Sequence, residues 1–327
     1  MLVAVESHAL LGSFGHGDAD LATAIEEHKA CIAQAPPPRA YAFPFLPRTD
    51  TSGLAAFHNP RALRQLDHFT RMALLGVGMA LKDAPSPKDE SGITGIILAS
   101  GYGAAEPTFS FMDSVLQYGE DMVSPLAFSH SVQNIPAAII ARQYGFIGPC
   151  LTVCQPAGAF PAALEVACLW LEQEMAHRVI LIAADEQHPF LPKVAQQLYS
   201  EQGIPPGDVS FGLGEGAAVF VLTAAKGNDA DPQPRLELLP ERDKVYPGSK
   251  EGIPCAFSSV TPFVSPGQET LFTGACGYGI LPVAQALDVS LHLALVAKNP
   301  LLAPSGHVCV STADKSIIYC HIEAIPA

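Results

Sequence analysis

Residues 148–160, GPCLTVCQPAGAF, contain a short apolar strand, a turn and the start of a helix. The strand is predicted over Leu151–Cys154, and small residues lead into a helix that begins near Phe160. A strand that turns directly into a helix can hold a reactive side chain at the helix N-terminus, where unpaired N–H groups stabilise a developing anion. The tip of this turn carries Ala157 and Gly158, neither of which has a reactive side chain.

The rest of the chain repeats this alternation of strands and helices. Strand-length apolar runs indicate buried strands, and longer stretches with an apolar repeat of three to four residues indicate helices. The predicted strands are 92–100, 178–184 and 217–222, and the predicted helices are 63–82, 135–144 and 159–176. Alternating strands and helices are typical of an α/β layered fold.

A polar linker divides the sequence into two parts. Residues 228–234, NDADPQP, are the clearest linker in the chain. We therefore predict an N-terminal half at 1–226 and a C-terminal half at 227–327. The second half contains a predicted helix at 281–296 and two predicted strands at 308–311 and 316–323. It has the pattern of a shortened version of the first half.

Composition indicates a compact, soluble protein. The chain has 327 residues, of which 49% are hydrophobic and 15% are charged. Its apolar runs have only strand length and its N-terminus lacks the basic region of a signal peptide, so we expect a cytoplasmic protein that does not insert into membranes. The eight cysteines form no CxxC pair and no Cys/His cluster, so neither a metal nor another cofactor is predicted.

Net charge limits the classes of partner. Thirty-two acidic residues outnumber 18 basic residues, giving a formal net charge of −14. This charge opposes binding to nucleic acid, to anionic membranes and to a strongly acidic carrier protein, unless basic residues gather on one face. Arg61, Arg64 and Arg71 lie in one predicted helical stretch, which is either such a docking patch or a solvated helix face.

Five segments together resemble the β-ketoacyl synthase family of the thiolase fold. They are LDHFTRMALLGVGMALKDA (66–84), GIILASGYGAAE (95–106), VSPLAFSHSVQNIPAAIIARQYGFIGP (123–149), HRVILIAADE (177–186) and GLGEGAAVFVL (212–222). They occur in the family's order with nearly its spacing. The resemblance implies two similar halves stacked as αβαβα layers and dimerisation through edge strands. It also implies a relationship to enzymes that extend acyl chains on a carrier protein by decarboxylative Claisen condensation.

The family's nucleophile is missing from its expected position. In the family, a cysteine stands nine positions after the glycine of the Gly-Pro pair, which corresponds here to Ala157. A methyl group cannot hold a thioester. Two nearby residues are candidates for a changed site. Cys154 is either a displaced nucleophile or a small buried hydrophobe of the strand, and Gln155 is notable because chain-length factors resemble synthases whose cysteine has become glutamine.

The groups that support decarboxylation in the family are missing as well. Its lysine and second histidine correspond here to Thr270 and Ala275, and no histidine occurs between His188 and His292. The glycine-rich loop that helps to bind the oxyanion corresponds to 311–315, which contains no glycine. The resemblance therefore implies a subunit that kept the fold without the chemistry, and no catalytic residue is assigned.

The segment 101–140 corresponds to the family's dimer interface, which contributes part of the partner's acyl tunnel. The candidate tunnel and interface residues are Ala105, Phe109, Met112, Leu126, Ala127, Phe128, His130 and Asn134. Ala105 and Ala127 stand where bulkier residues are usual, which leaves room for a longer or wider chain or accommodates local packing. Phe109, Phe111 and Met112 are explained either as the distal tunnel wall or as a helical core stripe.

These observations favour a catalytically inactive homologue similar to a chain-length factor. It would pair with an active ketosynthase that makes a polyketide, a polyene or an unusual fatty acid, and it would meet the acyl carrier protein through that complex. One alternative is an acyl-transferring or thioester-hydrolysing enzyme that uses Cys154 or an unrelated residue. Another is a homodimeric protein that binds an acyl chain or its carrier.

Overall fold

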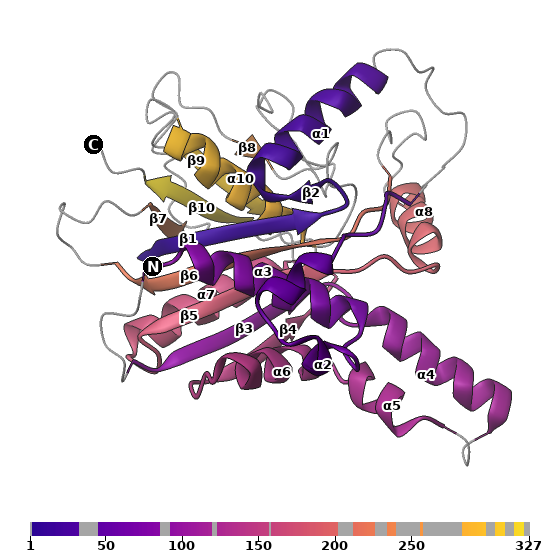
Figure 1. The fold of residues 1–327 in the computed structure, drawn as a ribbon. Coiled ribbons are helices and arrows are strands. Elements are labelled where there is room, and N and C mark those ends of the chain that lie inside the picture. Colours follow the sequence, from indigo (N-terminus) through magenta and orange to yellow (C-terminus); the bar gives the residue numbers. More distant parts are fainter. Residues whose placement is uncertain are drawn as a thin grey trace.

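The computed structural model describes residues 2–32, 45–85, 92–119, 123–156, 158–201, 212–225, 234–239, 256–257, 283–298, 305–310 and 317–323. Its strands are β1 (Leu2–Gly12), β2 (Gly15–His16), β3 (Thr94–Ser100), β4 (Cys150–Cys154), β5 (Arg178–Asp185), β6 (Gly216–Ala224), β7 (Arg235–Leu239), β8 (Ala256–Phe257), β9 (Ser305–Val310) and β10 (Ile317–Glu323). Hydrogen bonds connect them in the order β4-β3-β5-β6-β1-β7-β10-β9-β8, and β2 pairs with β1 (Figure 1).

The sheet is mixed. β3 lies between β4 and β5, and these three strands are parallel. β6 and β1 follow in antiparallel orientation. β7 then pairs antiparallel with β1, so the second half of the chain continues the hydrogen bonding of the first half at this point. One end of the described sheet is the short strand β4.

β5 and β6 form the centre of the sheet because both of their faces are apolar. Every residue of β5 is buried, and successive side chains point to opposite faces. Val179, Leu181 and Ala183 join one core cluster, whereas Ile180, Ile182 and Ala184 join the other. β6 divides in the same way, with Phe220 on the first side and Val219 on the second.

Helices cover both faces. They are α1 (Gly17–Ile32), the 3-10 helix η1 (Ser52–Ala56), α2 (Pro60–Leu63), α3 (His68–Asp83), α4 (Ala105–Tyr118), α5 (Pro125–Ser131), α6 (Ile135–Tyr144), α7 (Ala159–Glu172), α8 (Leu191–Glu201) and α10 (Ala284–Lys298). α3 and α6 pack on one face, and α7 and α10 pack on the other. Among the residues that the structure describes, no helix combines the length and apolar character needed to cross a bilayer.

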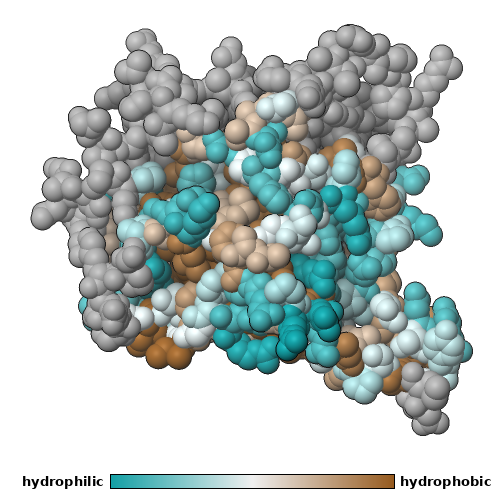
Figure 2. Space-filling view, viewed as in Figure 1, coloured by the Kyte–Doolittle hydropathy of each residue, from teal (hydrophilic) through white to brown (hydrophobic). Residues whose placement is uncertain are grey.

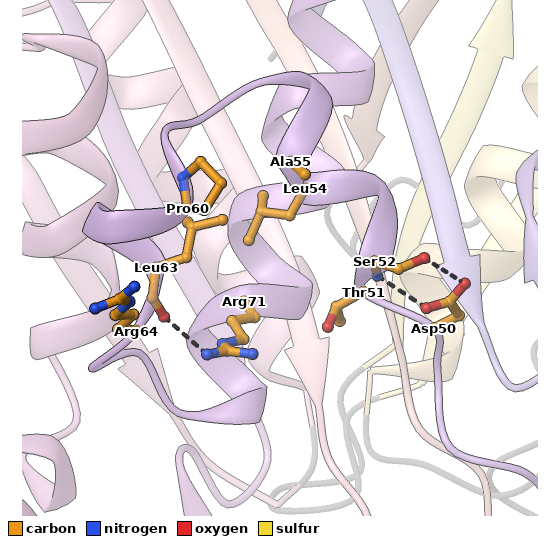
Figure 3. Close-up of a pocket in the computed structure, with 9 residues that line it drawn as sticks. All are labelled: Asp50, Thr51, Ser52, Leu54, Ala55, Pro60, Leu63, Arg64 and Arg71. Atoms are coloured by element: carbon orange, nitrogen blue, oxygen red, sulfur yellow. Dashed lines mark hydrogen bonds between the residues drawn. The ribbon is translucent and has the colours of Figure 1, made fainter.

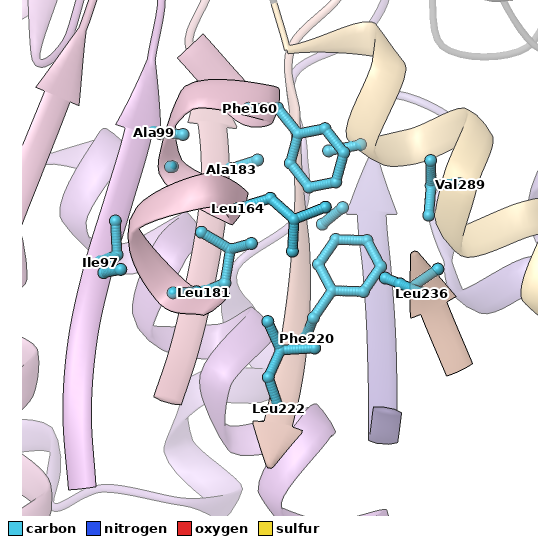
Figure 4. Packing of buried hydrophobic residues seen from close by; sticks show 14 of the residues in the cluster. Ile97, Ala99, Phe160, Leu164, Leu181, Ala183, Phe220, Leu222, Leu236 and Val289 are labelled. Atoms are coloured by element: carbon cyan, nitrogen blue, oxygen red, sulfur yellow. The ribbon is translucent and has the colours of Figure 1, made fainter. Parts of the chain in front are cut away.

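The layer formed by α7 and α10 joins the two halves of the chain. Figure 4 shows Phe160 and Leu164 of α7 beside Phe220 of β6 and Val289 of α10. The ring centroids of Phe160 and Phe220 are 5.5 Å apart. A helix of the second half therefore packs into the core of the first half, and the predicted α/β layered fold is confirmed.

Local sequence explains where the predicted elements differ from the observed ones. The helix expected at 63–82 begins only at His68, because Asp67 caps α3 by accepting a hydrogen bond from the Thr70 N–H at 2.8 Å, and Leu63 is the last residue of the separate helix α2. The helix expected at 135–144 coincides with α6, which ends at Gly145 in a left-handed conformation (φ 71°). α7 ends at Glu172, earlier than expected.

Candidate functional site

Asp185, the last residue of β5, fixes the turn after β3. Its Oδ1 accepts hydrogen bonds from Ser100 Oγ at 2.7 Å and from the Gly101 N–H at 2.8 Å. Its Oδ2 accepts one from the Val283 N–H at 3.1 Å, just before α10. Burial raises the pKa of this carboxyl to about 6, although the hydrogen bonds act in the opposite direction. The turn that leads to Ala105 is therefore held from the centre of the sheet.

A glycine with positive φ lets the chain before α6 approach this turn. Gly103 has φ +68°, and a Cβ there would overlap the side chain of Gln133. Gln133 lies in the segment between α5 and α6, next to Asn134. The start of α4 and the start of α6 are consequently held together by close contact that only glycine permits.

α4 and α5, here called the helical arm, extend away from the sheet (Figure 1). The two helices pack on each other, with the rings of Phe111 and Phe128 5.3 Å apart. At the base of the arm, Phe109 stacks on His188 at 4.3 Å and lies 5.0 Å from Phe190. Aromatic contacts thus support the arm from the loop that follows β5.

The candidate tunnel residues do not share one environment. Ala105 and His130 are buried, and Phe109 and Ala127 are half-buried. The exposed members are Met112, Leu126, Phe128 and Asn134. Because Met112 is 50% exposed, its interpretation as part of a core stripe is wrong. The assignment of these residues to a tunnel stays a prediction.

Apolar side chains are concentrated on the exposed surface of the arm and beside β4. This apolar interface surface consists of Met112, Leu116, Tyr118, Leu126, Phe128, Val132, Ile147 and Leu151. Leu116 is 82% exposed and Ile147 is 86% exposed. Figure 2 shows hydrophobic atoms among the polar ones on the arm. Exposed apolar patches of this kind mark sites of protein association.

β4 adds unpaired backbone groups to the same side of the molecule. Within the described chain, β4 pairs only with β3, and its other edge has no strand beside it. An open strand edge offers N–H and C=O groups to another chain. The apolar interface surface and this edge together form a candidate association site.

Buried polar residues anchor the arm to the body of the protein. This root cluster consists of Asp67, His68, His130, Glu186 and Glu215. His130 Nδ1 lies 2.7 Å from Asp67 Oδ2, and His68 Nε2 lies 2.7 Å from Glu215 Oε1. The Glu106 N–H, in the first turn of α4, donates to Glu186 Oε1 at 2.8 Å. The root cluster therefore joins α3, α4 and α5.

Two glutamates of the root cluster have opposite pKa shifts. Burial, together with the nearby charges of Asp67 and Glu106, raises the pKa of Glu186 to about 8. Its Oε2 is buried and has no hydrogen-bond partner among the described residues. Burial also acts to raise the pKa of Glu215, but hydrogen bonds from His68 and from two backbone N–H groups outweigh it and lower that pKa. The raised pKa favours the neutral form of Glu186 near pH 7, whereas the lowered pKa favours the ionised form of Glu215.

The turn between β4 and α7 has the predicted strand–turn–helix form. Gly158 adopts a left-handed conformation (φ 74°) just before α7. Cys154 is exposed, because β4 is an edge strand, so its interpretation as a buried hydrophobe is wrong. Although the residue is exposed, its Sγ is partly buried and lies 3.7 Å from the Gly101 carbonyl oxygen. This partial burial, together with the nearby Asp185, raises the thiol pKa. A raised pKa is the opposite of what an activated cysteine requires.

Several sequence predictions fall on residues whose positions the structure does not describe. Ala157, Thr270, Ala275 and the segment 311–315 lie outside the described residues. Gln155 is described and half-buried, and its N–H donates to the Ser100 carbonyl at 3.0 Å. Within the described ranges, no group of three or more His, Cys, Asp or Glu side chains is arranged to hold a metal.

Sequence reasoning did not assign Asp185, Glu186, Glu215 or His68 to the site. Asp185 is the last residue of a fully buried strand, Glu186 directly follows it, and Glu215 directly precedes another strand. Acidic residues at the ends of buried strands need hydrogen-bond partners when they are themselves buried. That position was the available signal, but it identifies neither the partners nor the arm that they anchor.

Comparison with known proteins identifies the family. The profile described as "Beta-ketoacyl synthase, N-terminal domain" matches residues 56–229, more than half of the chain. The chain is also 26% identical over 178 residues to a Schizosaccharomyces pombe protein provisionally named mitochondrial 3-oxoacyl-(acyl-carrier-protein) synthase. The match covers 49% of this chain and 41% of that relative, so it spans about two-fifths of the relative's length.

Solved structures agree on the fold. The ishigamide ketosynthase/chain length factor aligns with a TM-score of 0.72 and 16% identity, covering 100% of both chains. A type II polyketide synthase acyl-carrier protein in complex with its ketosynthase bound to the hexaketide aligns with a TM-score of 0.69 and 14% identity, covering 99% of both chains. The chain belongs to the β-ketoacyl synthase family and has its thiolase-like α/β fold.

Replacing Glu186 with Gln should reduce the dependence of stability on pH. Between an ordinary pKa of 4.5 and about 8, the unfolded state releases a proton that the folded state retains, so raising the pH favours unfolding. The wild type should lose about 1–3 kcal/mol of unfolding free energy between pH 6 and 8 from this group. The unfolding free energy of Glu186→Gln should therefore vary less with pH than that of the wild type between pH 6 and 8. This pH range lies above the one in which Asp185 contributes to the pH dependence. Denaturant unfolding at several pH values measures this pH dependence of the unfolding free energy.

The matched control is Glu172→Gln, an exposed glutamate on α7. The unfolding free energy of this variant should vary with pH as that of the wild type does. Equal slopes for the wild type and Glu186→Gln between pH 6 and 8 would show that Glu186 is ionised in the folded protein.

Proposed function

We propose that this chain is a non-catalytic, chain-length-factor-like subunit that pairs with an active ketosynthase. The observation that carries this proposal is the apolar interface surface beside the open edge of β4. An open strand edge and a large exposed apolar surface on the same side of a molecule suit an obligate interface. The pair is proposed to work in the cytoplasm on intermediates of a polyketide, a polyene or a fatty acid, bound to an acyl carrier protein.

The residues at the expected catalytic positions support the absence of condensing activity. Ala157 and Ala275 have no polar side-chain group, and Thr270 has a hydroxyl in place of the family's lysine ammonium, so the thiol and the two basic groups of the family's chemistry are missing. Cys154 has the thiol closest in sequence to Ala157, and the raised pKa keeps it protonated at neutral pH. Chemistry is therefore assigned to the partner subunit.

The role proposed for this subunit is to limit the space open to the growing chain. Ala127 and Leu126 lie on α5, at the apolar interface surface, where a partner subunit would cover them. Side-chain volume at such a boundary sets the depth of a preformed cavity. Small residues at this boundary favour a longer or wider product.

Expressing the chain together with the genes that neighbour its own, and testing whether a ketosynthase copurifies with it, tests the proposal directly. A stoichiometric complex should copurify, and only the complex should release elongated product. A well-behaved monomer that does not bind the ketosynthase, or thioester turnover by this chain alone, would contradict the proposal. Thioester turnover would favour the enzymatic alternative.

Replacing Phe128 with Asp should break the complex. Phe128 is 55% exposed, and a partner that covers it would have to bury an unpaired carboxylate. We expect the Kd for the ketosynthase to rise about 30-fold or more, which corresponds to an interface hot spot. Met175→Asp is the matched control, since Met175 is 45% exposed between α7 and β5, away from the arm. Titration calorimetry compares the two variants.

Native cysteines give an independent readout of the same interface. Cys150 and Cys154 are exposed on β4, whereas Cys168 is buried in α7. Adding the ketosynthase should protect Cys150 and Cys154 from alkylation, measured peptide by peptide, while Cys168 stays unreactive throughout. Unchanged labelling of both β4 cysteines in a complex that forms would place the interface elsewhere.

Ala127→Phe should shorten the product of the complex without preventing its assembly. The added ring would occupy space that the growing chain needs, and overpacking a preformed cavity costs about 1–3 kcal/mol. Ala62→Phe, an exposed position on α2 outside the segment 101–140, is the control and should leave product length unchanged. Mass spectrometry of released products compares them. If Ala127→Phe and the wild type release the same product, Ala127 does not line the tunnel.

Ala157→Cys should not create a condensing enzyme. The new thiol would react with alkylating reagents, but each missing electrostatic donor in such a site costs about 100- to 1,000-fold in rate. Thr270 and Ala275 do not supply those donors. Carbon dioxide release from a carrier-bound malonyl donor, without the partner, should therefore equal the wild-type background. Release well above that background would mean that the donors come from elsewhere in the chain.

A further inference from the structure

A pocket of about 460 Å³ opens between η1 and the segment that joins α2 to α3. Figure 3 shows Arg64 and Arg71 at one end of this pocket and Asp50 at the other. Figure 3 shows Leu63 beside Arg64 and Leu54 between Arg71 and Thr51, so apolar side chains line the pocket from the arginine end to its middle. The pocket is therefore cationic at one end, apolar in its middle and acidic at the far end.

Arg71 has hydrogen-bonding capacity that the protein does not use. One terminal nitrogen donates to the Leu63 carbonyl oxygen at 2.8 Å. Its Nε is buried and has no hydrogen-bond partner among the described residues. Because water cannot reach this buried nitrogen, a ligand in the pocket would contact the terminal nitrogens of the guanidinium group instead.

The positive charge at this end of the pocket is not neutralised by a carboxylate. Within the described residues, neither Arg64 nor Arg71 forms an ion pair. Asp50 is held away by Ser52, whose N–H and Oγ donate to its two carboxylate oxygens at 2.8 Å each. These hydrogen bonds lower the pKa of Asp50, so it stays ionised and directs an anion toward the arginines.

We propose that this pocket binds a small phosphate monoester with an apolar organic part. The two guanidinium groups would hold the phosphate oxygens, because the planar fork of arginine matches them in bidentate geometry. Thr51, whose side chain makes no capping hydrogen bond, offers a hydroxyl beside them. The organic part would lie against Leu54 and Leu63, and the pocket has the volume of typical small-molecule sites.

This site is independent of the proposed pairing with a ketosynthase. It lies on the connection to α3 rather than on the arm or β4. It also differs from a general basic surface. Arg61 is exposed on α2 but does not line the pocket, so a docking patch would use Arg61 as well as Arg64, whereas the pocket uses only Arg64 and Arg71.

Binding of phenyl phosphate to the purified chain, measured by titration calorimetry, tests the proposal. Phenyl phosphate should bind saturably, and inorganic phosphate should bind more weakly because it does not contact Leu54 and Leu63. Arg64→Gln should weaken phenyl phosphate binding about tenfold, the usual effect of losing a charged hydrogen-bonding partner. Arg71→Lys, which keeps the charge but loses the fork, should weaken it as well.

Arg61→Gln is the matched control and should bind phenyl phosphate like the wild type. Because Arg64 and Arg61 are both exposed, neither change should alter the melting temperature of the free protein. Equal losses in Arg61→Gln and Arg64→Gln would show general charge attraction and overturn the proposal. Equal affinity for inorganic and phenyl phosphate, or no saturable binding of either at millimolar concentration, would overturn it too.

Discussion

The hydrogen bonds of buried Asp185 determine much of the arrangement around the site. One carboxylate at the end of β5 accepts from the turn after β3 and from the backbone that begins α10. It therefore fixes where α4 leaves the sheet and where a helix of the second half joins the first. Removing the carboxylate would leave several buried N–H groups without acceptors, and each such loss costs about 1–3 kcal/mol.

The helical arm is attached mainly by polar contacts and by the base of α4. Only Ala105 and Pro107 are buried in α4, and only His130 is buried in α5. The exposed apolar side chains of the two helices, such as Met112, Leu116 and Leu126, lie where a partner can cover them. Consequently the arm's position depends on the root cluster, in which the pKa of Glu186 is raised and that of Glu215 is lowered. A change in charge there would act directly on the surface proposed to meet the partner.

The sequence predicted the fold well because its main elements are local patterns. The uniformly apolar strands β5 and β6 and the amphipathic helix α6 lie where periodicity placed them. The family assignment rested on five segments in register, and profile and structural matches confirm it. The break before α3 was not predicted, since the capping hydrogen bond of Asp67 competes with a helical repeat that continues through it.

The amino-acid sequence by itself determined the α/β class, the family and the identity of residues such as Ala157 at the expected nucleophile position. Tertiary structure alone decided that β4 is an edge strand and Cys154 exposed, that Met112 faces outward, and that two unpaired arginines share a pocket. The physical reason is that periodicity shows which side of an element is apolar. It does not show which neighbour covers that side, or which buried charges meet once the strands and helices have packed.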